Sequence, residues 1–304
     1  MRGGRQQLSV DRGRSTIVSI SSMLDAQPSR RASILTFDVK RGSLGLDLEQ
    51  ARTMRITKEA RRRRIRSQPL PELWQRILEG SVPLYRRLPA DDQRELTAHL
   101  QILLEEKHFE GAAGLNVTER IRLIVAAQAA VLLLHRSTDF FPKLVTILLY
   151  PGEYAVSEDM ETAEGVVVHV GESRAGEFWQ AGVLVLSWED VERDLADTDQ
   201  NVVLHEFAHQ LDAEDGEMNG APILANQKLR DRWATAMSDA FKRLTVAADH
   251  ERETLLDPYG AEDPAEFFAV ATEAFFLLPV ELECAEPDLY GVLRDFFLQD
   301  PARW

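Results

Sequence analysis

The stretch NVVLHEFAHQLD, residues 201–212, places two histidines four positions apart, with a glutamate directly after the first. Its apolar residues recur at helical spacing, so the pattern predicts a helix over 199–213. Residues i and i+4 share one helix face, so His205 and His209 can present imidazole nitrogens to a single Zn²⁺ ion. Glu206 is turned about 100° away and can reach a water molecule on the metal, where a general base belongs.

An ordinary amphipathic helix is the alternative interpretation of this stretch. The predicted helix is apolar almost all round, however, and polar side chains on a buried helix need partners. A bound metal ion would satisfy them, which favours a metal site. Asp197, Thr198 and Asp199 precede the helix and are candidate N-caps.

A catalytic zinc ion needs a third protein ligand and an open fourth position. Asp215 follows His209 by six residues, where metzincin-type sequences place that ligand. Such sequences turn the chain with a glycine three residues after the second histidine, and this chain has Asp212 there. The fit of Asp215 is therefore poor.

The segment DPYGAEDPAEFFAVATEAFF, residues 257–276, offers other carboxylates. Asp263 and Pro264 predict an N-cap followed by proline in the first helical turn. Glu266 and Glu273 lie seven positions apart, on the same face of an otherwise apolar helix. One of them would bind the metal while the other orients a histidine or the first helix.

The rest of the chain predicts an α+β fold that is mostly helical. Helical patterns fill residues 68–142, and strand patterns follow at 143–156, 165–171 and 182–188. Further helices are predicted at the end of the chain, over 226–247 and 264–278. We expect a domain over 68–304, with a helical N-terminal part up to 142 and a catalytic part from 143.

Four motifs together are more specific than the histidine pair alone: QAGVLVLSWEDV, NVVLHEFAHQLD, DPYGAEDPAEFFAV and FFLQDP. With them the sequence resembles the zincin peptidases of the Mlc titration factor A family over approximately residues 70–304. The resemblance implies a zincin-like metallopeptidase fold with a small mixed sheet, related to the catalytic domain of anthrax lethal factor. It also implies Glu266 as the third metal ligand and Tyr259 as a functional tyrosine.

Members of the resembled family are aminopeptidase-like enzymes that also bind a DNA-binding repressor controlling glucose uptake. The resemblance therefore implies one zinc ion per chain, a peptide substrate and a possible repressor partner. In this mechanism Glu206 is the general base, Tyr259 donates a hydrogen bond to the oxyanion, and the strand 182–187 pairs with an extended peptide. The alternative is a regulatory binding protein that sequesters a transcription factor, with a structural or vestigial metal site.

The net charge of −15 is unevenly distributed. Residues 1–67 contain 16 Lys and Arg against 6 Asp and Glu, whereas residues 68–304 contain 19 against 44. A domain this acidic repels nucleic acid and anionic membranes, so neither is an expected direct partner.

Residues 1–67 are rich in Arg, Ser and Gly and end in RRRRIR at 61–66. We expect this segment to be disordered, either dispensable or the result of translation starting at Met54 or later. Nucleic-acid contact through the arginines and a targeting peptide are the competing interpretations.

The compartment follows from two observations. The most apolar stretch, residues 123–134, is 12 residues long and suits a buried helix rather than a membrane span. Cys284 is the only cysteine, so no internal disulfide can form, which fits a reducing compartment. These observations predict a cytoplasmic protein without a membrane partner.

Overall fold

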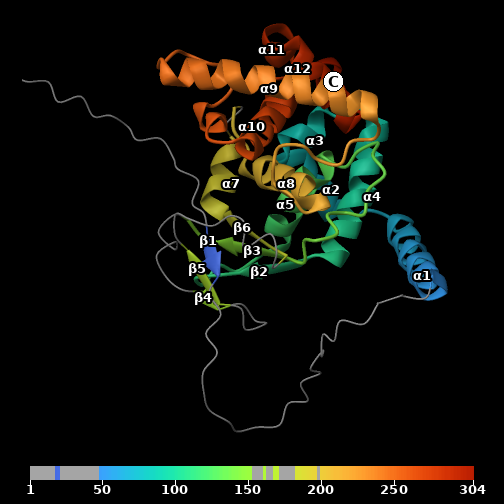
Figure 1. Ribbon diagram of the computed structural model, residues 1–304. Coiled ribbons are helices and arrows are strands. Elements are labelled where there is room, and N and C mark those ends of the chain that lie inside the picture. The colour runs from blue at the N-terminus through green and yellow to red at the C-terminus, as the bar shows by residue number, and fades with distance from the viewer. Residues whose placement is uncertain (1–17, 21–47, 153–159, 162–166, 171–181, 197–198) are drawn as a thin grey trace, which may run out of the picture.

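The computed structural model describes residues 18–20, 48–152, 160–161, 167–170, 182–196 and 199–304 (Figure 1). Its helices are α1 (Leu48–Arg66), α2 (Glu72–Ser81), α3 (Pro83–Arg87), α4 (Ala90–Glu106), α5 (Glu119–Val131), α7 (Trp188–Asp194), α8 (Val202–Asp212), α9 (Gln227–Asp249), α10 (Pro264–Leu277), α11 (Pro279–Ala285) and α12 (Pro287–Phe297). Short 3₁₀ helices are η2 (Ala213–Asp215), η3 (Pro258–Ala261) and η4 (Pro301–Arg303).

The strands form two small sheets. Strands β2 (His108–Gly111), β3 (Thr146–Tyr150) and β6 (Val183–Ser187) make a parallel sheet in the order β2-β3-β6. Strands β1 (Val18–Ile20), β5 (Val167–Val170) and β4 (Met160–Glu161) make an antiparallel sheet in the order β1-β5-β4. The two strand directions therefore occur in separate sheets. Strands β3, β5 and β6 lie within the three predicted strand regions, although residues 153–156 of the first region lie outside the described residues. Strand β2 lies in a stretch that the sequence predicted to be helical.

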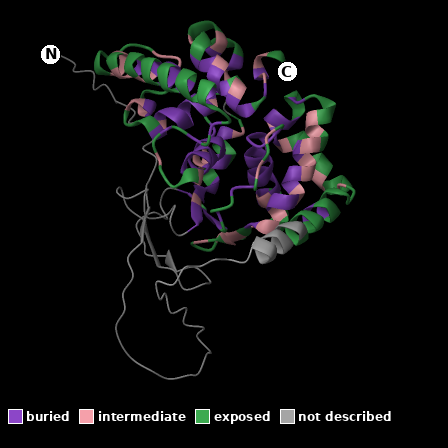
Figure 2. Ribbon diagram, turned by 45° about the vertical axis from the view of Figure 1, so that its right-hand side comes forward, coloured by how far each residue is buried: buried purple, intermediate pink, exposed green. Residues whose placement is uncertain are grey.

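Helix α8 occupies the centre of the molecule. It packs against α5, α7, α10 and β6, so that it lies between the parallel sheet and the helices α9 to α12 (Figure 1). Both α5 and α10 are buried along most of their length, as their apolar sequences predict (Figure 2). The predicted fold class, an α+β zincin-like metallopeptidase that is mostly helical, is confirmed.

The helix starts test the predicted caps. Thr118 caps α5 by accepting a hydrogen bond from the Ile121 backbone N–H. The cap of α8 is instead Asn201, two residues beyond the candidate Asp199. The Asn201 side chain accepts a hydrogen bond from the Leu204 N–H. The candidates Asp197 and Thr198 lie outside the described residues.

Helix α1 occupies the end of the segment that the sequence predicted to be disordered up to residue 67. The structure differs there, because residues 48–66 are helical and α1 packs on α4. Ile65 and Arg62 are buried, and Arg62 forms an ion pair with Glu106 of α4. The arginine run looks like a repulsive charge cluster in sequence, and its acidic partners become visible only in the fold.

Within the described residues, no helix combines the length and apolarity needed to cross a membrane. The apolar stretch noted in the sequence forms most of α5, which is buried inside the protein.

Candidate metal centre

Helix α8 presents two buried imidazoles on one face. The Asn201 cap and a hydrogen bond of 2.8 Å from the Val202 N–H to Oδ2 of Asp194 hold the start of the helix. One turn separates His205 from His209, and the centroids of their rings lie 4.9 Å apart. Their exposed fractions are 6% and 4%. The predicted pair therefore shares a helix face inside the protein.

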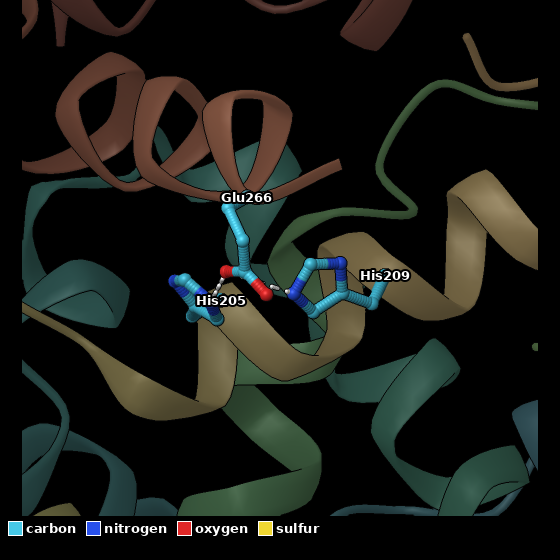
Figure 3. Close-up of side chains that lie close together, drawn as sticks. All are labelled: His205, His209 and Glu266. Carbon is cyan, nitrogen blue, oxygen red and sulfur yellow. Dashed lines mark hydrogen bonds and ion pairs between the residues drawn. The ribbon is translucent and has the colours of Figure 1, made fainter. Parts of the chain in front are cut away.

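Helix α10 supplies a carboxylate to the same place. Its N-cap is Asp263, with Pro264 in the first turn, as predicted. Oε2 of Glu266 lies 2.9 Å from Nε2 of His205 and 3.5 Å from Nε2 of His209. Figure 3 shows the Glu266 side chain reaching from α10 towards both rings. The two helices thus bring Glu266 next to two histidines, the first of which lies 61 residues earlier in the chain.

The donor set fits a divalent cation. One atom from each of His205, His209 and Glu266 lies within 4.8 Å of the other two. In a tetrahedral zinc site with bonds of about 2.0–2.2 Å, ligand atoms lie about 3.4 Å apart. The distances of 2.9 Å and 3.5 Å from Glu266 Oε2 to the two imidazole nitrogens are close to this spacing. Two imidazoles and one carboxylate, with a fourth position for water, form the ligand set typical of catalytic zinc.

The electrostatics of the cluster couple the two histidines to the nearby glutamates. Burial opposes the charged imidazole, but hydrogen bonds to Glu266 and Glu273 outweigh it and raise the pKa of His205 well above its ordinary value. Burial also disfavours the Glu266 carboxylate, yet hydrogen bonds to His205 and His209 hold its pKa well below the usual range. The Glu266 carboxylate therefore attracts the two histidines, as a negative group attracts groups that share a positive charge.

Glu273 lies behind His205, on the side away from Glu266. Its Oε1 is 2.8 Å from Nδ1 of His205, and its Oε2 accepts a hydrogen bond of 2.6 Å from the Asn201 backbone N–H. The same carboxylate therefore orients the imidazole and anchors the start of α8. Residue spacing left the roles of the two glutamates open, and the family resemblance implied Glu266 as the ligand. The geometry assigns Glu266 to the cluster and Glu273 to its support.

Replacing Glu273 with glutamine should weaken metal binding by roughly 10–100-fold, the range typical of outer-shell changes. An amide oxygen can accept only one of the two hydrogen bonds, and the amide N–H₂ would face a donor at the other. Metal affinity is measured by competition with a chromogenic chelator. The exposed Glu281→Gln on α11 is the matched control. Equal affinities for the two variants would contradict the supporting role.

Glu206 and Tyr259 lie beside the cluster. Burial raises the pKa of Glu206, which is half-buried and follows His205 directly. The Tyr259 ring centroid is 6.0 Å from that of His205. Burial, together with the charge of Glu266 and other nearby carboxylates, raises the pKa of Tyr259 well above its ordinary value, so its hydroxyl stays protonated and available as a donor.

The η3 turn places Tyr259. The Asp257 side chain accepts a hydrogen bond of 2.9 Å from the Tyr259 N–H. A Cβ at the next residue, Gly260, would lie 3.2 Å from side-chain atoms of Leu244 and Val270, which is closer than ordinary van der Waals contact. The close approach of η3 to α9 and α10 therefore favours a glycine at this position.

The rival ligand Asp215 takes no part in the cluster. Its side chain is exposed, and Oδ1 accepts a hydrogen bond of 2.9 Å from the Glu217 N–H. Asp212, which the sequence marked only as a missing glycine, is fully buried and accepts 2.8 Å from the Gly220 N–H. Gly220 in turn lies against the start of α10, because a Cβ at Gly220 would lie only 2.2 Å from the carbonyl oxygen of Pro264.

Asp212 thereby ties the loop after α8 to the start of α10. This positioning role of Asp212 was not predicted from the sequence. Its signal was the spacing of Asp212 three residues after His209 and seven after His205, which places it on the face that carries both imidazoles.

Comparison with known proteins shows the family to which the chain belongs. Residues 56–298 match the model of the family described as glucose-regulated metallo-peptidase M90, and the match begins inside α1. The uncharacterized protein slr2042 of Synechocystis sp. is 38% identical over 79% of this chain and 89% of its own length.

Two relatives carry the name Mlc titration factor A. The protein of Pectobacterium atrosepticum is 32% identical over 76% of this chain and 87% of its own length. The protein of Klebsiella pneumoniae is 29% identical over 75% and 86%. The chain therefore belongs to the Mlc titration factor A family of M90 glucose-regulated metallopeptidases.

Proposed function

We propose that this protein is a zinc-dependent, aminopeptidase-like enzyme that hydrolyses peptide bonds with one zinc ion per chain. The observation that carries the proposal is the convergence of His205, His209 and Glu266 within 4.8 Å, with Glu206 next to the first histidine. His205, His209 and Glu266 would hold the ion. Membership of a metallopeptidase family supports the same reading.

The roles of the chain's own groups follow from their positions. When bound, the zinc ion supplies an acidified water molecule and a Lewis acid. The Glu206 carboxylate accepts a proton as water attacks the scissile carbonyl and then delivers it to the leaving amine. Tyr259 donates a hydrogen bond to the oxygen that becomes negatively charged. Burial of the two histidines limits the access of bulk water.

Strand β6 would position the substrate. It pairs with β3 on one side, and within the described residues no strand pairs with its other side. Strand β6 also packs against α8, which carries both histidines. An extended peptide that pairs with the free edge of β6 would run past the metal centre.

Binding of a DNA-binding repressor is the second candidate function, alone or beside hydrolysis. It is favoured by the relatives named Mlc titration factor A, at up to 32% identity. Such a function would place the protein in the cytoplasm. If it operates separately from hydrolysis, a Glu206→Gln protein retains the partner in a pull-down with purified repressor. If binding depends on a working site, that variant loses the partner.

Metal analysis combined with reporter hydrolysis tests the proposed function. We expect the purified protein to contain about one zinc ion per chain and to hydrolyse amino-acid and peptide reporters, because the ligand set is complete. A chelator should abolish hydrolysis, and added Zn²⁺ should restore it. Hydrolysis that persists in metal-free protein, or a protein that binds no zinc, would overturn the proposal.

A further inference from the structure

The turn between α5 and β3 has an unusual backbone. Phe140 and Phe141 have φ angles of 60° and 53°, in the left-handed region that bulky residues rarely adopt. Both side chains are 1% exposed. Such a conformation persists only where the surroundings hold it, and strain of this kind is concentrated near functional sites.

Arg62 of α1 binds the turn from one side through hydrogen bonds and a ring contact. Its guanidinium donates to Oδ1 of Asp139 at 2.6 Å and to the Asp139 carbonyl at 3.1 Å, and it lies 4.5 Å from the Phe140 ring centroid. Two further hydrogen bonds of 2.7 Å reach the Glu106 carboxylate. The Arg62 side chain is only 4% exposed. One buried side chain therefore joins α1, α4 and the strained turn.

Lys107 holds the turn from within. Its buried ammonium donates hydrogen bonds of 2.7 Å to the carbonyls of Phe141 and Leu144. Burial lowers the pKa of Lys107 to about 8, which shows how far this charge is removed from water. The backbone of the turn is thus fixed by two cations, one from α1 and one from the end of α4.

The other face of the turn contacts α8. The Phe141 ring packs edge-on against Phe207, with centroids 4.8 Å apart, and Phe207 lies between Glu206 and His209 in the sequence. Lys143 donates a hydrogen bond of 2.7 Å to the carbonyl of Ala213, directly after the last residue of α8. The turn therefore touches the middle and the end of the helix that carries both histidines.

From these contacts we infer that Arg62 is a positioning residue for the metal centre. Docking of α1 through Arg62 sets the backbone of the 139–141 turn. The turn in turn sets the position of α8 relative to Glu266 on α10. The inference rests on the proposed metal site and adds a remote element to it: metal affinity depends on the docking of a helix that contributes no ligand.

The Arg62→Met full-length protein tests this inference, because methionine keeps the apolar stem and loses the guanidinium. We expect its zinc dissociation constant to rise by about tenfold, at the lower end of outer-shell effects. We also expect the visible absorption bands of the Co²⁺-substituted protein to shift, because they report ligand geometry. Arg61→Met is the matched control: Arg61 is 52% exposed, pairs with Glu105, and should leave both readouts unchanged.

Two further variants distinguish a specific effect on the metal centre from a general loss of stability. Leu289→Ala removes a fully buried side chain from α12, away from the turn, and should lower the thermal midpoint without shifting the Co²⁺ bands. Asp139→Ala changes a residue whose side chain is 54% exposed, so the protein should fold. It should shift the bands in the same direction as Arg62→Met, by a smaller amount.

Two results would overturn the inference. Unchanged affinity and Co²⁺ bands in both Arg62→Met and Asp139→Ala would reduce Arg62 to a structural ion pair. Equal band shifts in Leu289→Ala would show that any destabilisation has this effect. Because the readout is metal binding, a failed inference leaves zinc bound normally in every variant. A failed proposed function is distinguished by the absence of zinc from the unmodified protein, which overturns both.

Discussion

The Glu206→Gln protein should hydrolyse peptide reporters on the order of 10³-fold more slowly than the unmodified protein while retaining about one zinc ion per chain. The amide has the shape of the carboxylate but cannot accept a proton at neutral pH. Because Glu206 is not part of the His205, His209 and Glu266 cluster, metal binding should be preserved. The measurement is kcat by reporter hydrolysis, with zinc content determined on the same preparation.

A neighbouring glutamate provides the control for this prediction. Glu217 is exposed and lies in the loop after η2, so Glu217→Gln removes one negative charge near the end of α8 without touching the cluster. Its kcat should stay within about twofold of the original, since surface changes of this kind are usually nearly neutral. Full activity in Glu206→Gln would remove Glu206 from the role of base.

The Glu266→Ala protein should lose most of its bound zinc, with an affinity decrease larger than the roughly 10–100-fold expected for an outer-shell residue. It removes the oxygen that lies 2.9 Å from His205 and 3.5 Å from His209. The two imidazoles would then be left without a third protein ligand. Zinc content after dialysis and affinity by chelator competition measure the effect.

Asp215→Ala is the control that separates the two ligand assignments. The Asp215 carboxylate is exposed and bonded to the Glu217 backbone, so its loss should leave zinc affinity unchanged. If Asp215→Ala lost zinc while Glu266→Ala retained it, the metzincin-like assignment would hold and the cluster in α8 and α10 would not be the metal site.

Much of the fold could be predicted from local sequence. The spacing of His205 and His209 within an apolar run predicted both α8 and the shared face of the imidazoles. The Asp263–Pro264 pair predicted the start of α10. These predictions succeeded because hydrogen bonding and side-chain spacing within one helix depend on residues fewer than five positions apart.

The assignment of the two glutamates could not be made in this way. Glu266 and Glu273 share a helix face, and each could equally have met the histidines. Their roles depend on the position of α10 along α8, because a displacement of about two turns would bring Glu273 to the place that Glu266 occupies. Only the packed structure, with Glu273 bonded to the Asn201 backbone, distinguishes the ligand position from the supporting one.

The ion-pair partners of the arginines in α1 could not be predicted from the sequence either. In sequence the arginines at 61–64 indicated a self-repelling segment. In the fold Glu106 and Asp139 neutralise Arg62, and the Phe140 ring covers it.

By itself, the sequence determined the central helices α8 and α10, the two histidines on one face and the family to which the motifs point, and through that family the expectation that Glu266 is the third ligand. Only the tertiary structure showed that Glu266 meets both histidines, that Glu273 supports one of them, and that α1 packs on the rest of the domain. The physical reason is that contacts across 44 to 77 residues depend on the summed packing of whole elements, which no local spacing encodes.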